Sequence, residues 1–217
     1  MIHQETQVPR WWWLWLLMGW LALTLPNLWL PELNYREALP AQLALSMASA
    51  GDQALVTRLA GQTQLVPPLA AWLLAILQHW LPLSEFNVRL LSVLPLALLA
   101  SLCAWITGRR AGWVAGAAAA AAALSATGTL RLAMRGGGEM LFALLINCAW
   151  LVWYVWHRER QKPLLAWVLC LLLVCLAMLA DGLMAIPLFY GPLLFVSRPM
   201  VAWRRFFCLD HGLALLL

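Results

Sequence analysis

The feature that most constrains this chain is a series of apolar runs long enough to cross a lipid bilayer. The first, Trp11–Leu30, has 20 residues without a charge. As a helix it reaches about 30 Å, the thickness of a hydrocarbon core. With 64% hydrophobic and 11% charged residues, a soluble protein of 217 residues would have more apolar surface than its core could bury. We therefore expect an all-α, polytopic membrane protein.

Other classes of protein fit the pattern less well. A transmembrane β-barrel needs alternating segments, and runs such as Gly116–Leu124 do not alternate. The basic residues lie in short loops and form no single patch, so no nucleic-acid partner is expected. The five cysteines show no metal-ligand or redox spacing and fit apolar packing. A small transporter is disfavoured because the spans show no internal repeat.

Six spans and an incomplete seventh are predicted, all in one transmembrane domain over residues 1–217. The incomplete segment is Phe206–Leu217, and two interpretations of it stay open: the chain is a fragment, or this tail lies in the membrane interface. The predicted spans are Trp11–Leu30, Val88–Thr107, Ala111–Leu130, Met140–Trp156, Leu164–Ala180 and Leu183–Ser197.

One long segment, residues 31–87, differs from the short loops because it combines charges, prolines and turn residues. Within it, Tyr35–Ala50 has helical composition broken by Pro40, and Gly51-Asp52 is typical of a helix end. Pro67–Leu83 is apolar but short and carries Gln78 and His79. We expect it to lie in the interface instead of crossing, because polar groups at mid-bilayer would lack partners.

Charge counting gives the orientation. If Pro67–Leu83 does not cross, nine basic residues fall on the cytoplasmic side and five outside, as the positive-inside rule favours. The amino terminus is then cytoplasmic, and residues 31–87 are external. The inner set is Arg10, Arg109, Arg110, Arg158, Arg160, Lys162, Arg198, Arg204 and Arg205; the outer set is Arg36, Arg58, Arg89, Arg131 and Arg135.

Short blocks in the external segment and beyond resemble a known enzyme family in their order and spacing. They are Met47–Asp52 (MASAGD), Arg58–Gly61 (RLAG), Pro67–Trp72 (PPLAAW), Ser84–Arg89 (SEFNVR), Gly138–Leu141 (GEML) and Ala180–Gly182 (ADG). The pattern is similar to the polyprenyl-phosphate-sugar glycosyltransferases of family 39. These include the aminoarabinose transferase that modifies lipid A and the protein O-mannosyltransferases, and they share the GT-C membrane fold.

The resemblance implies a function and a location. It implies binding of a polyprenyl-phosphate-linked sugar and its transfer to a lipid or protein acceptor at the external face of a bacterial inner membrane. A divalent cation, Mg²⁺ or Mn²⁺, and basic residues would hold the lipid phosphate. An external carboxylate would take a proton from the acceptor, and the sugar would leave with inversion.

The residues that match these roles form a rearranged set. Glu37 is the expected catalytic carboxylate; Arg36, Arg58 and Arg89 are expected at the phosphate, and Asp52 and Glu139 in an acidic or metal-binding cluster. Simpler interpretations stand beside these roles. Glu37 with Arg36 suits a solvated ion pair, Asp52 a turn or helix cap, and Glu139 a helix cap.

The sequence departs from the family at three chemical positions. Arg36 stands where the family has the Asp that acts as the catalytic base. Leu65-Val66 stands where the family has Glu-Lys, and Asp181 stands where it has the Lys of Thr-Lys-Gly. These changes remove the base, the Glu-Lys pair that serves the metal and the phosphate in the family, and one further lysine. They predict slow or absent transfer by this chain alone, and they leave open a catalytically inactive or truncated relative that acts as a membrane-embedded partner or regulator.

Overall fold

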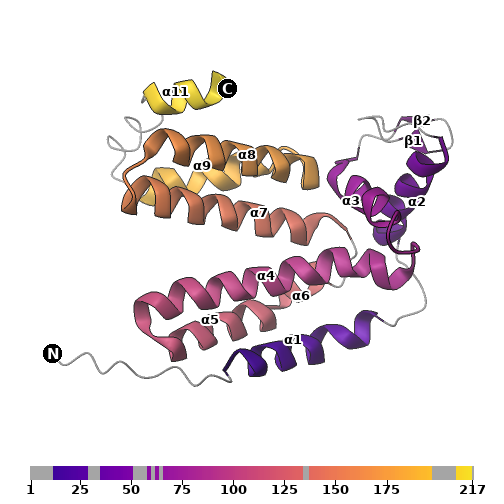
Figure 1. Cartoon of the computed structure of the whole chain (residues 1–217), viewed down its shortest axis with the longest axis horizontal. Coiled ribbons are helices and arrows are strands. Elements are labelled where there is room, and N and C mark those ends of the chain that lie inside the picture. Colours follow the sequence, from indigo (N-terminus) through magenta and orange to yellow (C-terminus); the bar gives the residue numbers. More distant parts are fainter. Residues whose placement is uncertain are drawn as a thin grey trace. The chain divides into compact units, whose positions relative to one another are not determined.

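In the computed structural model the chain is almost entirely helical, as expected (Figure 1). The structure describes residues 12–28, 35–50, 58–59, 62–63, 66–133, 137–196 and 209–216. Within them, the one departure from helix and turn is a pair of two-residue antiparallel strands, with Arg58 opposite Thr63. The elements are α1 (Trp12–Leu28), α2 (Tyr35–Ala50), β1 (Arg58–Leu59), β2 (Gln62–Thr63), α3 (Leu69–Leu77), α4 (Glu85–Ala111), α5 (Trp113–Ser125), α6 (Thr127–Ala133), α7 (Glu139–Val152), the π-helix η1 (Trp153–Glu159), α8 (Pro163–Asp181), α9 (Ala185–Val196) and α11 (Leu209–Leu216).

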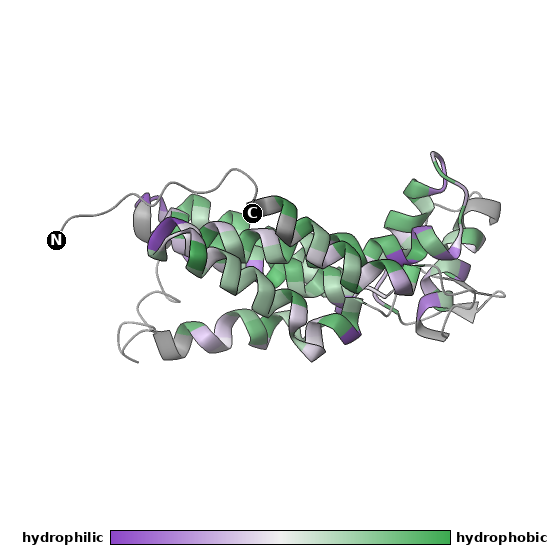
Figure 2. Cartoon of the chain, turned by 90° about the horizontal axis from the view of Figure 1, so that it is seen from below, coloured by the Kyte–Doolittle hydropathy of each residue, from purple (hydrophilic) through white to green (hydrophobic). Residues whose placement is uncertain are grey.

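Several of these helices have the length and composition of membrane spans. Three segments qualify among the described residues, Glu85–Ala111, Glu139–His157 and Pro163–Asp181, and the α5–α6 pair makes a fourth if it counts as one span. Figure 2 shows apolar residues over most of the helical surface. Large apolar side chains such as Val114, Leu172 and Leu183 are exposed, which suits lipid contact. The chain is therefore a multi-pass helical membrane protein.

Among the described residues, fewer full-length spans are found than the six predicted, and the ends of the predicted first and sixth spans lie outside those residues. The expected third span is broken, because α5 and α6 meet at an angle of 59° around Ala126. The expected first and sixth spans are α1 and α9, with 17 and 12 residues. The expected incomplete seventh span contains α11, with 8 residues. Apolar composition sets where a helix can form, but it does not fix whether the helix stays straight.

Pro40 does not break the second helix, contrary to the prediction. It is buried inside α2, which runs unbroken from Tyr35 to Ala50. A proline in a helix interior costs about 3 kcal/mol. The helix is stabilised by packing, because Ala41 and Ala44 are buried against Leu74 of α3 and Val88 of α4.

The segment predicted to lie in the interface contains α3, which has 9 residues. At 1.5 Å per residue it is about 14 Å long and cannot cross a bilayer by itself. The two polar residues that follow it are accommodated: Gln78 Nε2 donates to the Ala44 carbonyl at 3.4 Å, and His79 Nδ1 lies 2.9 Å from the Ala75 carbonyl. The orientation of α3 relative to the membrane stays a prediction.

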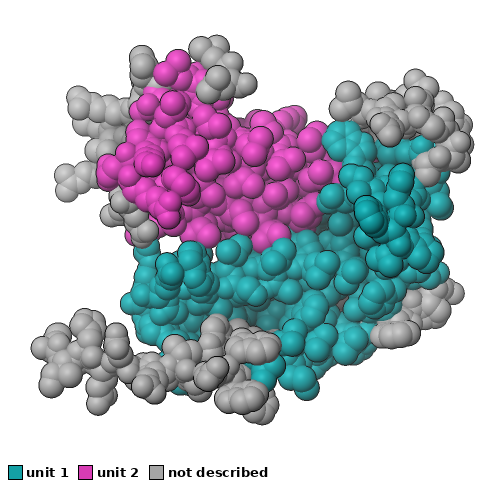
Figure 3. Space-filling view, viewed as in Figure 1, with its two compact units in different colours: residues 1–64, 70–140 teal, residues 65–69, 141–217 magenta. Residues whose placement is uncertain are grey.

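By its internal contacts the chain divides into two compact units, residues 1–64 with 70–140 and residues 65–69 with 141–217 (Figure 3). In unit 1, α4 and α5 form a helical hairpin whose connecting residue is Gly112, at φ 88°. The two helices approach closely at Gly116, where an added Cβ would lie 2.6 Å from the Ala104 carbonyl oxygen. From α1, Trp20 Nε1 donates to the Val93 carbonyl of α4 at 3.3 Å.

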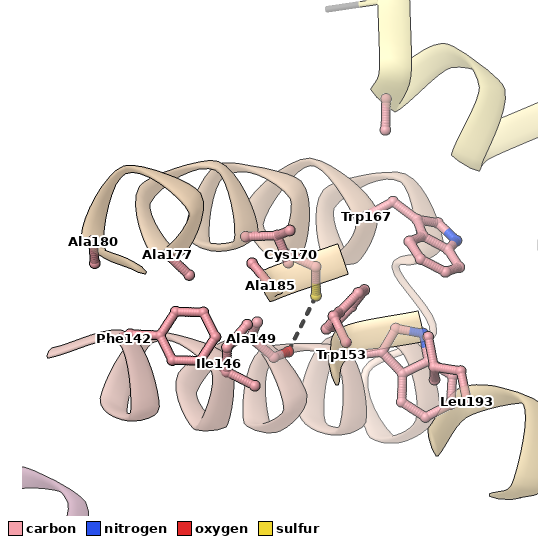
Figure 4. Packing of buried hydrophobic residues seen from close by; sticks show 13 residues of the cluster. Phe142, Ile146, Ala149, Trp153, Trp167, Cys170, Ala177, Ala180, Ala185 and Leu193 are labelled. Carbon is pink, nitrogen blue, oxygen red and sulfur yellow. Dashed lines mark hydrogen bonds between the residues drawn. The ribbon is translucent and has the colours of Figure 1, made fainter. Parts of the chain in front are cut away.

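Unit 2 has an apolar core between α7, η1, α8 and α9 (Figure 4). Trp167 and Phe189 are fully buried in it, and Cys170 Sγ donates to the Ala149 carbonyl at 3.2 Å. Helix α11 joins this unit through His211, whose Nε2 lies 3.0 Å from the Tyr190 hydroxyl. That a single domain covers residues 1–217 stays a prediction.

Candidate functional site

The centre of the candidate site is a buried ion pair between Glu37 and Arg89. Arg89 Nη2 lies 3.3 Å from Glu37 Oε2, and the two side chains are 2% and 1% exposed. The residues are 52 positions apart in the sequence. The pair therefore joins α2, in the segment 31–87 that the sequence singles out, to the start of α4.

The first turns of two helices position this pair. Glu37 lies in the first turn of α2, where a carboxylate interacts favourably with the helix dipole. Helix α4 starts at a defined residue, since the Ser84 hydroxyl accepts the Asn87 N–H at 3.3 Å as an N-cap. Asn87 Nδ2 also donates to the Pro82 carbonyl at 2.6 Å. These contacts define where α4 begins, with its N-cap five residues before Arg89.

A second contact extends the site toward the start of α7. Ser92 lies three residues after Arg89, on the same side of α4, and is fully buried. Its hydroxyl donates to the Gly137 carbonyl at 3.0 Å. Gly137 in turn lies against the carboxylate of Glu139, the first residue of α7, so closely that any Cβ at this position would collide with it.

Two of the predicted site residues are thus in direct contact, and a third is linked to them through Ser92 and Gly137. Glu37, Arg89 and Glu139 come from the amino-terminal turns of three helices, and this set carries one cation and two carboxylates. Together they form a small charged centre at the amino-terminal ends of these helices.

The other predicted residues are not brought into this centre by any described contact. Arg36 belongs to α2 and Arg58 to β1, but their side chains lie outside the described part of the chain, as does Asp52 altogether. The roles expected of these three residues stay predictions.

A divalent cation has no evident ligand set in this region. The described residues contain no group of three or more His, Cys, Asp or Glu side chains that could hold a metal ion. Within the centre, one of the two carboxylates is engaged by a guanidinium, which competes with a cation for its oxygens. The described donors do not fit Mg²⁺ or Mn²⁺, so no chemical step is assigned to a metal here.

Ser92 and Gly137 were not identified from the sequence. A weak signal for Ser92 was present, because it is a hydroxyl in an apolar span one helical turn after Arg89. Gly137 stands inside Gly136-Gly137-Gly138, a turn signal that does not show which glycine a carboxylate will touch.

Comparison with known proteins gives a match in structure but not in sequence. No family model and no curated protein matches the chain. Two crystal structures of ArnT from Cupriavidus metallidurans do match. With ArnT bound to undecaprenyl phosphate the TM-score is 0.76 at 20% identity, covering 96% of this chain and 40% of that one. With ArnT in the apo state it is 0.73 at 20% identity, covering 94% and 40%.

This likeness shows the fold. Over the part that it matches, the chain has the same helical architecture as ArnT, in agreement with the membrane fold that the sequence resemblance implied. The chain spans about 40% of the length of the structures it matches.

Proposed function

We propose that this chain is a membrane glycosyltransferase-like protein that binds a polyprenyl-phosphate-linked sugar at the external face of a bacterial inner membrane. The observation that carries the proposal is the buried Glu37–Arg89 pair in a fold shared with ArnT, which was crystallised with undecaprenyl phosphate. A guanidinium in an apolar protein suits a lipid phosphate, because it offers several N–H donors in a planar fork.

In this proposal Arg89 is the principal ligand of the lipid phosphate, and Arg36 and Arg58 add positive charge. In the structure Arg89 interacts with Glu37. Binding of a phosphate then places a second anion on the guanidinium, and the low dielectric of the site strengthens both interactions. In this proposal Arg89 contacts Glu37 and the lipid phosphate together.

Transfer would use Glu37 as the general base. The acceptor hydroxyl gives its proton to the carboxylate, its oxygen bonds to the anomeric carbon, and the bond from that carbon to the phosphate oxygen breaks with inversion. General-base assistance of this kind is worth roughly 10² to 10⁴ in rate. Because the structure holds Glu37 in a buried ion pair, we propose that transfer by this chain alone is slow.

A second candidate function is a catalytically inactive relative that binds the lipid and acts as a membrane-embedded partner. Two observations favour it: Glu37 is 1% exposed, and Asp181 stands where the resemblance implies a lysine. Both candidates share lipid binding and differ only in turnover.

The test is reconstitution of the purified chain with an undecaprenyl-phosphate sugar and a lipid A or peptide acceptor. We expect lipid binding with little or no transfer, and any transfer should fall at least about 100-fold in Glu37→Gln. The control is Glu85→Gln, which removes an exposed carboxylate at the start of α4. This change should leave lipid binding and sugar transfer unchanged. Robust turnover that survives Glu37→Gln would overturn the assignment of the base.

A further inference from the structure

Two tryptophan–arginine pairs recur at the ends of long helical segments, one in each unit. At the end of α4 the Arg109 guanidinium lies over the Trp105 ring, with its carbon 4.6 Å from the ring centroid. At the end of η1 Arg160 lies over Trp156 at 4.4 Å. Both pairs have the same four-residue spacing, about one helical turn.

The pairs lie where an amphipathic group is expected to meet the membrane surface. Trp105 is 47% exposed, and Arg109 and Arg160 are exposed. Tryptophan favours the level of the lipid headgroups, because its ring is apolar and its N–H is polar. A guanidinium stacked on the ring uses its face for this contact, so its N–H edges remain directed outward for an anion.

A second cation follows each pair in the sequence. In unit 1, Arg110 follows directly, and the helix ends at Gly112, whose N–H donates to the Gly108 carbonyl at 3.1 Å. In unit 2, Gln161 has a φ of 53°, and the Lys162 N–H donates to the Trp156 carbonyl at 3.0 Å. This bond keeps the Lys162 backbone at the end of the segment that carries Trp156 and Arg160.

We propose that each Trp–Arg pair, with its neighbouring cation, binds the phosphate of an anionic phospholipid from the surrounding leaflet. The occupant is argued from charge, because each pair presents two cations at the end of an apolar helix. The predicted topology places both pairs on the cytoplasmic side, where anionic lipids give the surface a negative potential. In unit 1 this binding is separate from the donor site, because the charged centre lies at the opposite end of α4.

Arg131 and Trp80 are matched controls. Arg131 is an exposed arginine in the last turn of α6 and, within the described residues, has no such ring partner. Trp80 is 83% exposed and, in the same part of the chain, no arginine lies over it. Their substitution removes the same charge or the same ring without touching a pair.

Native mass spectrometry of the purified chain tests the proposal, with phosphatidylglycerol and phosphatidylcholine of identical acyl chains as probes. We expect selective binding of phosphatidylglycerol. Arg109→Ala and Arg160→Ala should each weaken one site about fivefold. Trp105→Leu and Trp156→Leu keep the charge, and each should weaken phosphatidylglycerol binding at its own pair about two- to fivefold. Arg131→Ala and Trp80→Leu should match the unmodified chain.

Several outcomes would overturn the proposal. Equal binding of phosphatidylcholine would show that charge is not recognised. An equal loss in Arg131→Ala would mean that only the total charge matters. Unchanged affinity in Arg109→Ala and Arg160→Ala would mean that these arginines serve only the helix ends, where cations are favoured by the dipole. All four arginine and tryptophan positions of the pairs are at least partly exposed, so folding should survive each change, as elution in detergent can verify.

Discussion

The ion pair between Glu37 and Arg89 predicts a specific pattern in a double-mutant cycle. We consider Glu37→Leu, Arg89→Met and the combined variant. Removing one partner leaves a charge buried at 1% or 2% exposure, which typically costs 3–5 kcal/mol. The Nη2–Oε2 distance of 3.3 Å is longer than that of a strong charge-assisted bond, about 2.7–2.9 Å. We therefore expect each single change to cost about 3 kcal/mol, at the lower end of that range.

The combined variant should recover most of this loss. Replacing both charges with apolar groups of similar volume removes the desolvation cost together with the attraction, and such replacements are often neutral. We expect the double variant to be more stable than the sum of the single effects predicts by at least about 2 kcal/mol. The assay is reversible unfolding in mixed micelles, followed by loss of helical circular dichroism. Additivity within about 0.5 kcal/mol would refute the inference that the two side chains interact in the folded protein.

Two further predictions concern packing and topology. Gly116→Ala should destabilise the α4–α5 hairpin by about 1–3 kcal/mol in the same unfolding assay, because the new methyl group meets backbone atoms. The control is Gly128→Ala, whose methyl group meets nothing within 4 Å, so this change should be neutral or stabilising. Equal effects of the two changes would contradict the close approach of α4 and α5 at Gly116. Single cysteines at Ser49 and Gln161, in a background without native cysteines, should react with an impermeant maleimide differently: the first in intact cells, the second only after permeabilisation. The reverse pattern would exclude an external segment at residues 31–87.

Parts of the fold were predictable because they depend on length and composition alone. Val88–Thr107 and Leu164–Ala180 lie within α4 and α8, since an uninterrupted apolar run of this size has few alternatives to a spanning helix. The bend at Ala126 was not predicted. An alanine-rich run favours helix at every position and gives no signal for where the axis turns.

The geometry of the candidate site was not predictable from the sequence. Glu37, Arg89 and Glu139 were singled out because they stand in or near the blocks that resemble the family, and their roles stay predictions. The simpler interpretation paired Glu37 with its neighbour Arg36, whose side chain lies outside the described residues. The structure pairs Glu37 with Arg89, 52 residues away. The packing of α2 against α4 brings these two side chains together, and no local pattern in the sequence reveals it.

The central claim is that Arg89 binds the phosphate of a polyprenyl lipid, and direct binding measurement tests it best. Native mass spectrometry of the purified chain should detect a complex with undecaprenyl phosphate that undecaprenol, which lacks the phosphate, does not displace. The variant Glu37→Gln/Arg89→Gln keeps the site close to neutral and retains polar contacts, so it should fold. Its affinity for undecaprenyl phosphate should fall at least tenfold, as expected when a charged hydrogen bond worth about 1.5–3 kcal/mol is lost. Binding of undecaprenyl phosphate by this variant as tightly as by the unmodified chain, or equal binding of undecaprenol, would contradict the account.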